Sequence, residues 1–210
     1  DKFFEPTFQT YFPNAAAWAT FGYDIDAGFF AEAGVAKVLG ECVLCVRRNV
    51  DLDSAETIEL VNVNKNGVEV IEPNPFTSGG ARWNVMAAYG AQKKLGKSHE
   101  QAVEYLRELF KHVSVQDKSA RESLQTFTGG KGDVLLAYEN EAIQAQQSGA
   151  DIAFVRPAAT LLIENPIAVL KNSQHQAEAK AFVAFTRGAV AQEIYAQYGY
   201  RPIDKTVLEK

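Results

Sequence analysis

The sequence has no cluster of lysine and arginine residues. Its 210 residues include 21 Lys and Arg against 26 Asp and Glu, which gives a net charge of −5 and an isoelectric point of about 5.3. Proteins that bind nucleic acids usually present a basic face. We therefore expect no nucleic-acid partner.

Long apolar runs are missing as well. The longest, such as residues 158–163, are far shorter than the roughly 20 apolar residues that cross a bilayer as a helix. No secretory leader is visible, and the chain begins at Asp1 rather than Met. We interpret it as a processed or trimmed form.

Cysteine is scarce, with only Cys42 and Cys45 in the stretch ECVLCVRR. The C-x-x-C spacing could indicate a redox or metal site, but the Val-Leu-Val pattern predicts a buried strand. Residues three apart on a strand point to opposite faces, so these thiols could not easily pair or chelate together. No second C-x-x-C completes a zinc site. We predict two unreactive core thiols that are not bridged to each other.

Catalytic motifs are also lacking. The sequence shows no Ser-His-Asp arrangement, no nucleotide-binding loop and no paired-carboxylate site, and its three histidines are scattered. We therefore expect a protein that is not an enzyme and that holds no metal or cofactor.

The sequence does contain alternating strand and helix patterns. Candidate strands are 17–22, 42–48, 68–71, 133–138, 152–155 and 160–163; candidate helices are 3–12, 24–33, 78–95, 98–110, 139–147, 176–187 and 190–198. Strands interleaved with helices of this length predict an α/β fold with mostly parallel sheets.

The most informative motif is Thr77-Ser78-Gly79-Gly80, which stands directly before a predicted helix. A helix N-terminus presents unpaired amides and a partial positive charge, glycine lets a ligand approach the backbone, and a hydroxyl adds a donor. The motif therefore predicts an anion site. The alternative is an ordinary serine N-cap after a flexible loop.

The wider context resembles a known family. EPNPFTSGGARWNVMAAYG closely resembles the signature of periplasmic sulfate-binding proteins, the solute receptors of sulfate and thiosulfate ABC importers. The stretches GYDID, VSVQDKSARESLQTF, GKGDVLLAYENEA and YGYRPID agree with the same family, in the same order. The resemblance covers roughly residues 19–204.

The resemblance implies a type II periplasmic-binding fold, in which two α/β lobes enclose a ligand cleft. Lobe 1 would comprise residues 1–48 with 163–210 and would be incomplete, and lobe 2 would comprise residues 49–162. Such a protein would be periplasmic or otherwise exported.

The resemblance also implies a site for sulfate or thiosulfate that uses neutral donors only. Carried over to this chain, the donors are the Ser78 hydroxyl and the amides of Gly79, Gly80 and Ala120. Tyr138 stands where the family has a tryptophan indole, and its phenol can both donate and accept. Sulfate is fully ionised at neutral pH, so it suits donors better than a protonated phosphate, which needs an acceptor.

The sequence departs from the family at its start. The family carries a first strand, a long helix and a Gly/Ser-rich turn that supplies two further sulfate donors, whereas only 23 residues precede Asp24 here and none is serine. Either segments are omitted from this sequence or the protein has lost part of its site. Two functions follow: a receptor that delivers sulfate or thiosulfate to an ABC permease, or a degenerate relative kept as a structural subunit of a larger membrane-associated complex.

Overall fold

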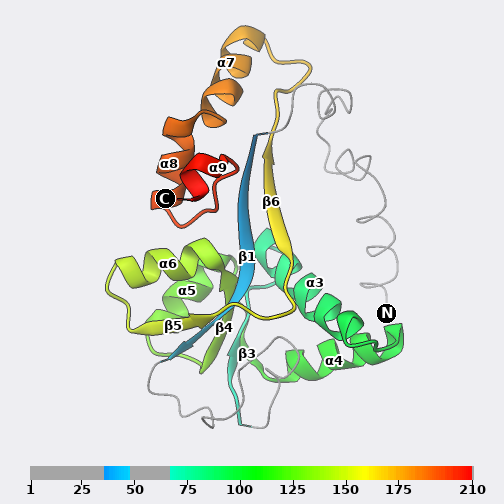
Figure 1. The fold of residues 1–210 in the computed structure, drawn as a ribbon. Coiled ribbons are helices and arrows are strands. Elements are labelled where there is room, and N and C mark those ends of the chain that lie inside the picture. The colour runs from blue at the N-terminus through cyan, green and yellow to red at the C-terminus, as the bar shows by residue number, and fades with distance from the viewer. Residues whose placement is uncertain (1–35, 48–66, 210) are drawn as a thin grey trace. The chain divides into compact units, whose positions relative to one another are not determined.

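The computed structural model describes residues 36–47 and 67–209, and the chain folds into two compact units (Figure 1). One unit comprises residues 39–164 with 197–201, and the other contains, within the described part, residues 36–38, 165–196 and 202–209. Two of the unit boundaries in the described part fall inside β1 (Ala36–Arg47) and β6 (Leu162–Ile167), and two more lie on either side of residues 197–201. The elements predicted over residues 3–12, 17–22 and 24–33 lie outside the described residues.

The larger unit is built on a mixed sheet with the order β3-β2-β4-β1-β5 (Figure 1). Its other strands are β2 (Val70–Ile71), β3 (Val113–Val115), β4 (Val134–Tyr138) and β5 (Ile152–Val155), and β6 pairs with β1. Strand β2 runs parallel to β3 and β4, but β1 runs antiparallel to β4 and β5. The α/β class is thus confirmed, and the sheet is mixed rather than mostly parallel because β1 inserts between two strands of opposite direction.

Helices cover both sides of these strands. Helices α3 (Gly79–Lys94) and α4 (His99–Lys111) lie on one side, and α5 (Ala120–Thr128) and α6 (Glu139–Gln147) lie on the other (Figure 1). Strand β4 is therefore covered on both faces, and its residues Val134 to Ala137 are at most 2% exposed. A continuous apolar run is what such a strand requires.

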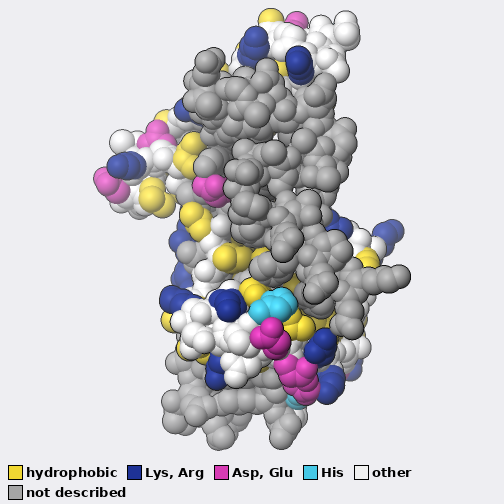
Figure 2. Space-filling model, turned by 90° about the vertical axis from the view of Figure 1, so that its right-hand side faces the viewer, with side chains coloured by type: hydrophobic (Ala, Val, Ile, Leu, Met, Phe, Trp, Pro, Cys, Tyr) yellow, Lys and Arg dark blue, Asp and Glu magenta, His cyan; other side chains and the backbone are white. Residues whose placement is uncertain are grey.

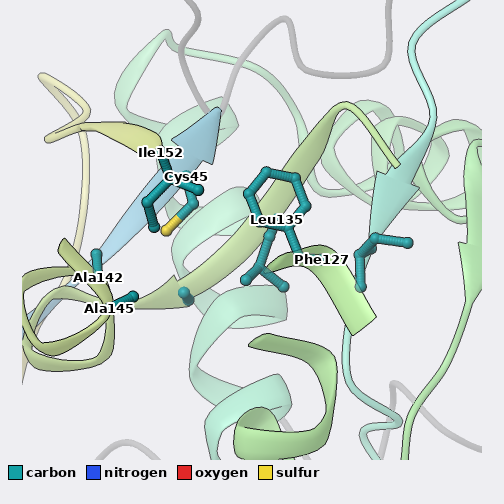
Figure 3. Packing of buried hydrophobic residues seen from close by; sticks show 8 residues of the cluster. Cys45, Phe127, Leu135, Ala142, Ala145 and Ile152 are labelled. Atoms are coloured by element: carbon teal, nitrogen blue, oxygen red, sulfur yellow. The ribbon is translucent and has the colours of Figure 1, made fainter. Parts of the chain in front are cut away.

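A compact apolar cluster joins the sheet to α5 and α6. Figure 3 shows Phe127 of α5 and Ala142 and Ala145 of α6 packed around Leu135, Cys45 and Ile152. Cys45 is a buried free thiol, and burial, followed by the charge of Glu141, raises its pKa to about 12. The prediction of an unreactive, unbridged core thiol is confirmed for Cys45, whereas the side chain of Cys42 lies outside the described residues.

The predicted helix signals agree with the observed ends. The Ser78 hydroxyl caps α3, and Gly96 follows that helix with a φ of +79°. Ser98 and Gln101 form the expected capping box of α4, in which each side chain accepts a backbone amide of the other residue. Strand β3 and helices α5 and α9 (Lys205–Leu208) were not predicted.

Residues 197–201 belong to the larger unit and pack against α6. Gly199 has a φ of +79°, and a Cβ built on it would lie 3.0 Å from Ile143 Cβ and 3.1 Å from Asn140 Cα. The Gln144 side chain donates to the Tyr198 carbonyl over 3.0 Å. Both the backbone conformation and the close contact therefore require glycine here.

The described part of the second unit is held by a buried glutamine. Gln192, on α8 (Ala189–Gln197), is 0% exposed and donates to the Thr186 carbonyl at the end of α7 (Gln176–Thr186) over 2.8 Å. Its side-chain oxygen accepts the Ile203 amide over 2.8 Å. Among the described helices, none is long and apolar enough to cross a membrane.

Substituting Gly199 with alanine should destabilise the protein more than the same change at Gly149. Both glycines have positive φ, which costs an alanine about 1–2 kcal/mol, but a Cβ at Gly149 meets nothing within 4 Å. We expect Gly149→Ala to lower the free energy of unfolding by that amount and Gly199→Ala to lower it by about 2–4 kcal/mol, because overpacking is added. Urea denaturation of both variants measures the difference, and equal losses would contradict the role of the contact with α6.

Candidate functional site

The first residues of three helices meet at Gly80. Helix α3 begins at Gly79, α5 begins at Ala120, and Tyr138 is the N-cap residue of α6. A Cβ built on Gly80 would lie 3.3 Å from Ala120 Cβ and 3.2 and 3.3 Å from Cε2 and Cζ of the Tyr138 ring. The sequence-predicted residues Gly80, Ala120 and Tyr138 are therefore in contact, although they are far apart in the sequence.

Ser78 and Gly79 complete this group at the start of α3. Ser78 is 6% exposed, and its hydroxyl oxygen accepts the Ala81 amide over 3.3 Å, so its own hydrogen remains to be donated. Gly79 is exposed and Gly80 is buried. Amides in the first turn of a helix have no acceptor within the helix. The five predicted site residues thus form one neighbourhood that is rich in hydrogen-bond donors.

Two loops hold the helices in this arrangement. The loop before α3 and the loop before α5 are joined by the Asn74 amide, which donates to the Asp117 carbonyl over 2.8 Å. The Thr77 hydroxyl donates to the Lys118 carbonyl over 2.8 Å. Ser119 then caps α5 as Ser78 caps α3. The N-termini of α3 and α5 are therefore fixed relative to each other by the backbone, without charged side chains.

An ion cluster lies at the start of α6. The carboxylate of Glu139 is 2% exposed and pairs with both Arg156 and Arg201. Arg201 donates from Nε to Oε2 over 2.7 Å and from Nη2 to Oε1 over 3.0 Å. Burial opposes ionisation, but Arg201 and then Arg156 outweigh it and hold the pKa of Glu139 below its ordinary value. From the sequence alone, an acidic residue at the start of a helix is explained by the helix dipole, so the sequence does not predict this cluster. An acidic residue directly after a buried strand is the signal that could have indicated it.

Glu141 lies two residues further along α6, and its surroundings act on its carboxyl in the opposite direction. Burial raises the pKa of Glu141, against the opposing effects of the Tyr138 amide, which its carboxylate accepts, and of nearby Arg121. Its Oε2 atom is buried and finds no hydrogen-bond partner among the described residues. The Tyr138 backbone is thus held from both sides, by its strand and by Glu141.

The described surface mixes charges of both signs. In the face that Figure 2 shows, Lys and Arg side chains lie interspersed with Asp and Glu among the described residues. On α4 the exposed residues Arg107 and Lys111 pair with Glu104 and Glu108. A nucleic-acid interface instead gathers basic side chains on one face.

A family model described as bacterial extracellular solute-binding protein matches residues 8–201. The chain belongs to this family. An extracellular family agrees with the expected export of the protein. The match extends over both units of the chain and includes all five predicted site residues.

The curated relatives of this solute-binding protein bind sulfur oxyanions, by their names. It is 40% identical over 145 residues to the sulfate-binding protein of Synechococcus elongatus, a match that covers 67% of this chain and 41% of the relative. It is 33% identical over 153 residues to the thiosulfate-binding protein of Pseudomonas aeruginosa, covering 70% and 46%. The chain thus spans less than half the length of these relatives.

A solved structure agrees with both the family and the fold. The sulfate-binding protein SubI from Mycobacterium tuberculosis matches with a TM-score of 0.79 and 34% identity, covering 92% of this solute-binding protein and 67% of that chain. The predicted resemblance to sulfate- and thiosulfate-binding proteins and the type II fold are confirmed. The prediction that the chain is not an enzyme is confirmed by relatives that are named as binding proteins.

Replacing Gly80 with alanine should disturb the site, whereas replacing Gly79 should not. A Cβ at Gly79 meets nothing within 4 Å, but one at Gly80 must displace Ala120 or the Tyr138 ring by a few tenths of an ångström. Both changes gain about 1 kcal/mol of helix propensity. We expect Gly79→Ala to raise the free energy of unfolding and Gly80→Ala to leave it unchanged or lower it. Tyrosine fluorescence and denaturant unfolding of the two variants check this, and identical behaviour would contradict the contact.

Replacing Glu139 with glutamine should destabilise the protein in a pH-dependent way. Because the folded pKa of Glu139 lies below its unfolded value, its stabilisation is present above about pH 4.5 and is lost as the pH falls through the folded pKa. We expect a loss of about 1–3 kcal/mol at pH 7, since Glu139 is buried but both arginines are partly exposed, and a smaller loss at pH 3.5. Glu104→Gln, in an exposed pair, serves as the control and should cost less than about 1 kcal/mol.

Proposed function

We propose that this protein binds sulfate or thiosulfate where α3, α5 and α6 begin and delivers the anion to an ABC permease from the periplasm. The contact of Gly80 with Ala120 and Tyr138 carries this proposal. It gathers the first turns of helices that belong to three separate stretches of the chain. The proposed donors are the Ser78 hydroxyl, the amides of Gly79, Gly80 and Ala120, and the Tyr138 hydroxyl.

Helix N-termini suit a doubly charged anion without a counter-charge. Each N-terminus carries roughly half a positive charge and several unpaired amides, and phosphate and sulfate groups often bind there. Hydrogen bonds to an ionised group are each worth about 1.5–3 kcal/mol. Several such bonds can replace the water that sulfate loses, and no lysine or arginine is needed to contact it.

The donor set favours sulfate over phosphate. Backbone amides only donate, whereas a phosphate that keeps a proton must also find an acceptor. Glycine at position 80 favours anion binding in another way, because the lack of a side chain lets the backbone amides approach the anion closely. The names of the relatives agree, since they are sulfate- and thiosulfate-binding proteins.

Two lobes that close around the anion would make delivery possible. Solute-binding proteins of this architecture close by a hinge motion around the ligand. Donors from the first lobe would then add to those described here, and the permease would recognise the closed form. The receptor function therefore depends on both lobes, and the described residues account for one part of the site.

The test is calorimetric titration of the natural-length protein with sulfate and thiosulfate. We expect the natural-length protein to bind, and Ser78→Ala to weaken binding about 10- to 150-fold through the loss of one charge-assisted hydrogen bond. Gly79→Asp should abolish binding, because its carboxylate would face the dianion, whereas Gly79→Ala should preserve it.

Two results would contradict the proposal. Unchanged affinity in Gly79→Asp would exclude the start of α3 as the site. An absence of binding by the natural-length protein would favour the second function, a degenerate relative kept as a structural subunit of a membrane-associated complex.

A further inference from the structure

Two buried polar side chains lie beneath the candidate anion site. Glu72 directly follows β2, and Asn84 lies on α3 four residues after Gly80, which is about one helical turn or about 6 Å along the axis. Each is 2% exposed. The Asn84 amide nitrogen donates to Glu72 Oε2 over 3.2 Å and to the Leu136 carbonyl of β4 over 3.1 Å. This pair therefore connects β2, α3 and β4.

Each partner also has an oxygen that is buried without a hydrogen-bond partner among the described residues. These atoms are Glu72 Oε1 and Asn84 Oδ1. Both are acceptors while Glu72 is ionised, so they cannot bond to each other. A single proton on Oε1 would turn it into a donor and would satisfy both atoms, since buried polar groups in proteins are almost always paired.

We propose that Glu72 is a neutral carboxylic acid that pairs with the Asn84 amide through two hydrogen bonds, and that this pair positions the first turn of α3 for anion binding. In the second bond, Glu72 Oε1–H donates to Asn84 Oδ1. Glu72 and Asn84 are positioning residues, since they act through α3 and not on the anion. The functional part rests on the proposed anion site; the pairing itself does not.

The surroundings of Glu72 favour the neutral form. Burial raises the pKa of Glu72 well above its ordinary 4.5, and the Asn84 hydrogen bond opposes this only in part. No charged side chain of the described part acts on this carboxyl. From β4, the Leu136 carbonyl accepts the other hydrogen bond of the Asn84 side chain, and from β3 the Val115 carbonyl accepts the backbone amide of Glu72.

The charged groups near these elements are engaged elsewhere. Glu69, beside β2, pairs with Lys131, and Arg82, on α3, donates to the Pro75 carbonyl. Asp117, after β3, accepts the hydroxyls of Ser123 and Thr126. None of them supplies a positive charge that would hold Glu72 ionised.

Ionisation of Glu72 would affect the site in two ways. It would place a negative charge beside Asn84, which lies about one turn after Gly80 on α3, and a negative charge there repels an anion. It would also break the second hydrogen bond, so that α3 would lose part of its attachment to the end of β2. Anion affinity should therefore fall as the pH rises toward the pKa of Glu72.

The test is the variant Glu72→Gln, because an amide keeps one donor and one acceptor but has no proton to lose. In the natural-length protein we expect sulfate affinity to fall more than threefold between pH 6 and pH 9, below the range in which tyrosine hydroxyls ionise, and to change less than threefold in Glu72→Gln. Glu69→Gln is the matched control, since it removes an acidic group at the same strand and should keep the pH dependence.

Stability gives a second readout. Because the folded pKa is raised, stability is lost as the pH rises from about 4.5 toward that pKa. The melting temperature of Glu72→Gln should therefore exceed that of the unsubstituted protein at pH 8 and approach it near pH 4. A melting temperature with the same pH dependence in both would overturn the pairing.

Infrared spectroscopy separates the two proposals. A carbonyl stretching band of a protonated carboxylic acid should be present at neutral pH, lost in Glu72→Gln and kept in Glu141→Gln, which removes the other buried carboxyl whose pKa is raised, with or without sulfate. If no such band is found, the neutral pair is wrong. If the band is present but the natural-length protein binds no anion, the proposed function fails and the pair stands. If anion affinity has the same pH dependence in Glu72→Gln as in the unsubstituted protein, the pair has no role in binding.

Discussion

The close approach of α3 to α5 and α6 depends on the absence of a side chain at Gly80. With a Cβ, the start of α3 would press on Ala120 and on the Tyr138 ring, at 3.2–3.3 Å. Glycine is a poor residue for a helix interior, by about 1 kcal/mol relative to alanine. A Gly-Gly pair in the first turn of a long helix therefore lowers stability. The close contact of Gly80 with Ala120 and Tyr138 explains why the second residue of the pair is glycine. Gly79, which meets nothing, is explained by access to its amide instead.

Three acidic residues, Glu72, Glu139 and Glu141, lie near these helix N-termini, and their surroundings affect their ionisation in different ways. Glu139 is ionised and neutralised by Arg156 and Arg201, while burial favours the protonated form of Glu141 and of Glu72. All three arrangements have the same electrostatic effect, because they reduce the net negative charge close to the amides of the first turns. A site that attracts anions with half-charges of helix dipoles tolerates little uncompensated negative charge nearby.

The sequence predicted the elements whose signals are local. Ser78 and Ser98 marked the starts of α3 and α4, Gly96 marked an end, and the apolar run 133–138 marked β4. It did not predict β3, since three residues carry little periodicity, and it did not predict α5, although α6 has the same length of nine residues and was predicted. Strand β6 extends through Asn165 and Pro166, which read as a turn; proline is tolerated there because β6 pairs with β1 outside the main order of the sheet.

The candidate site was named through a family resemblance rather than through local physics. A lone Ser-Gly-Gly predicts no more than a capped helix, and nothing in the sequence shows that Ala120 and Tyr138 reach Gly80. The Glu72–Asn84 hydrogen bond was equally hidden, because an isolated glutamate after a strand usually faces solvent. The burial of Glu72 follows from the tertiary structure, because Glu72 lies where β2 ends under α3. The single amide nitrogen of Asn84 donates both to the Glu72 carboxyl and to the Leu136 carbonyl. An amide group in that place can satisfy a neutral acid completely and an ionised one only in part, so the protonation state is part of how the helix is attached.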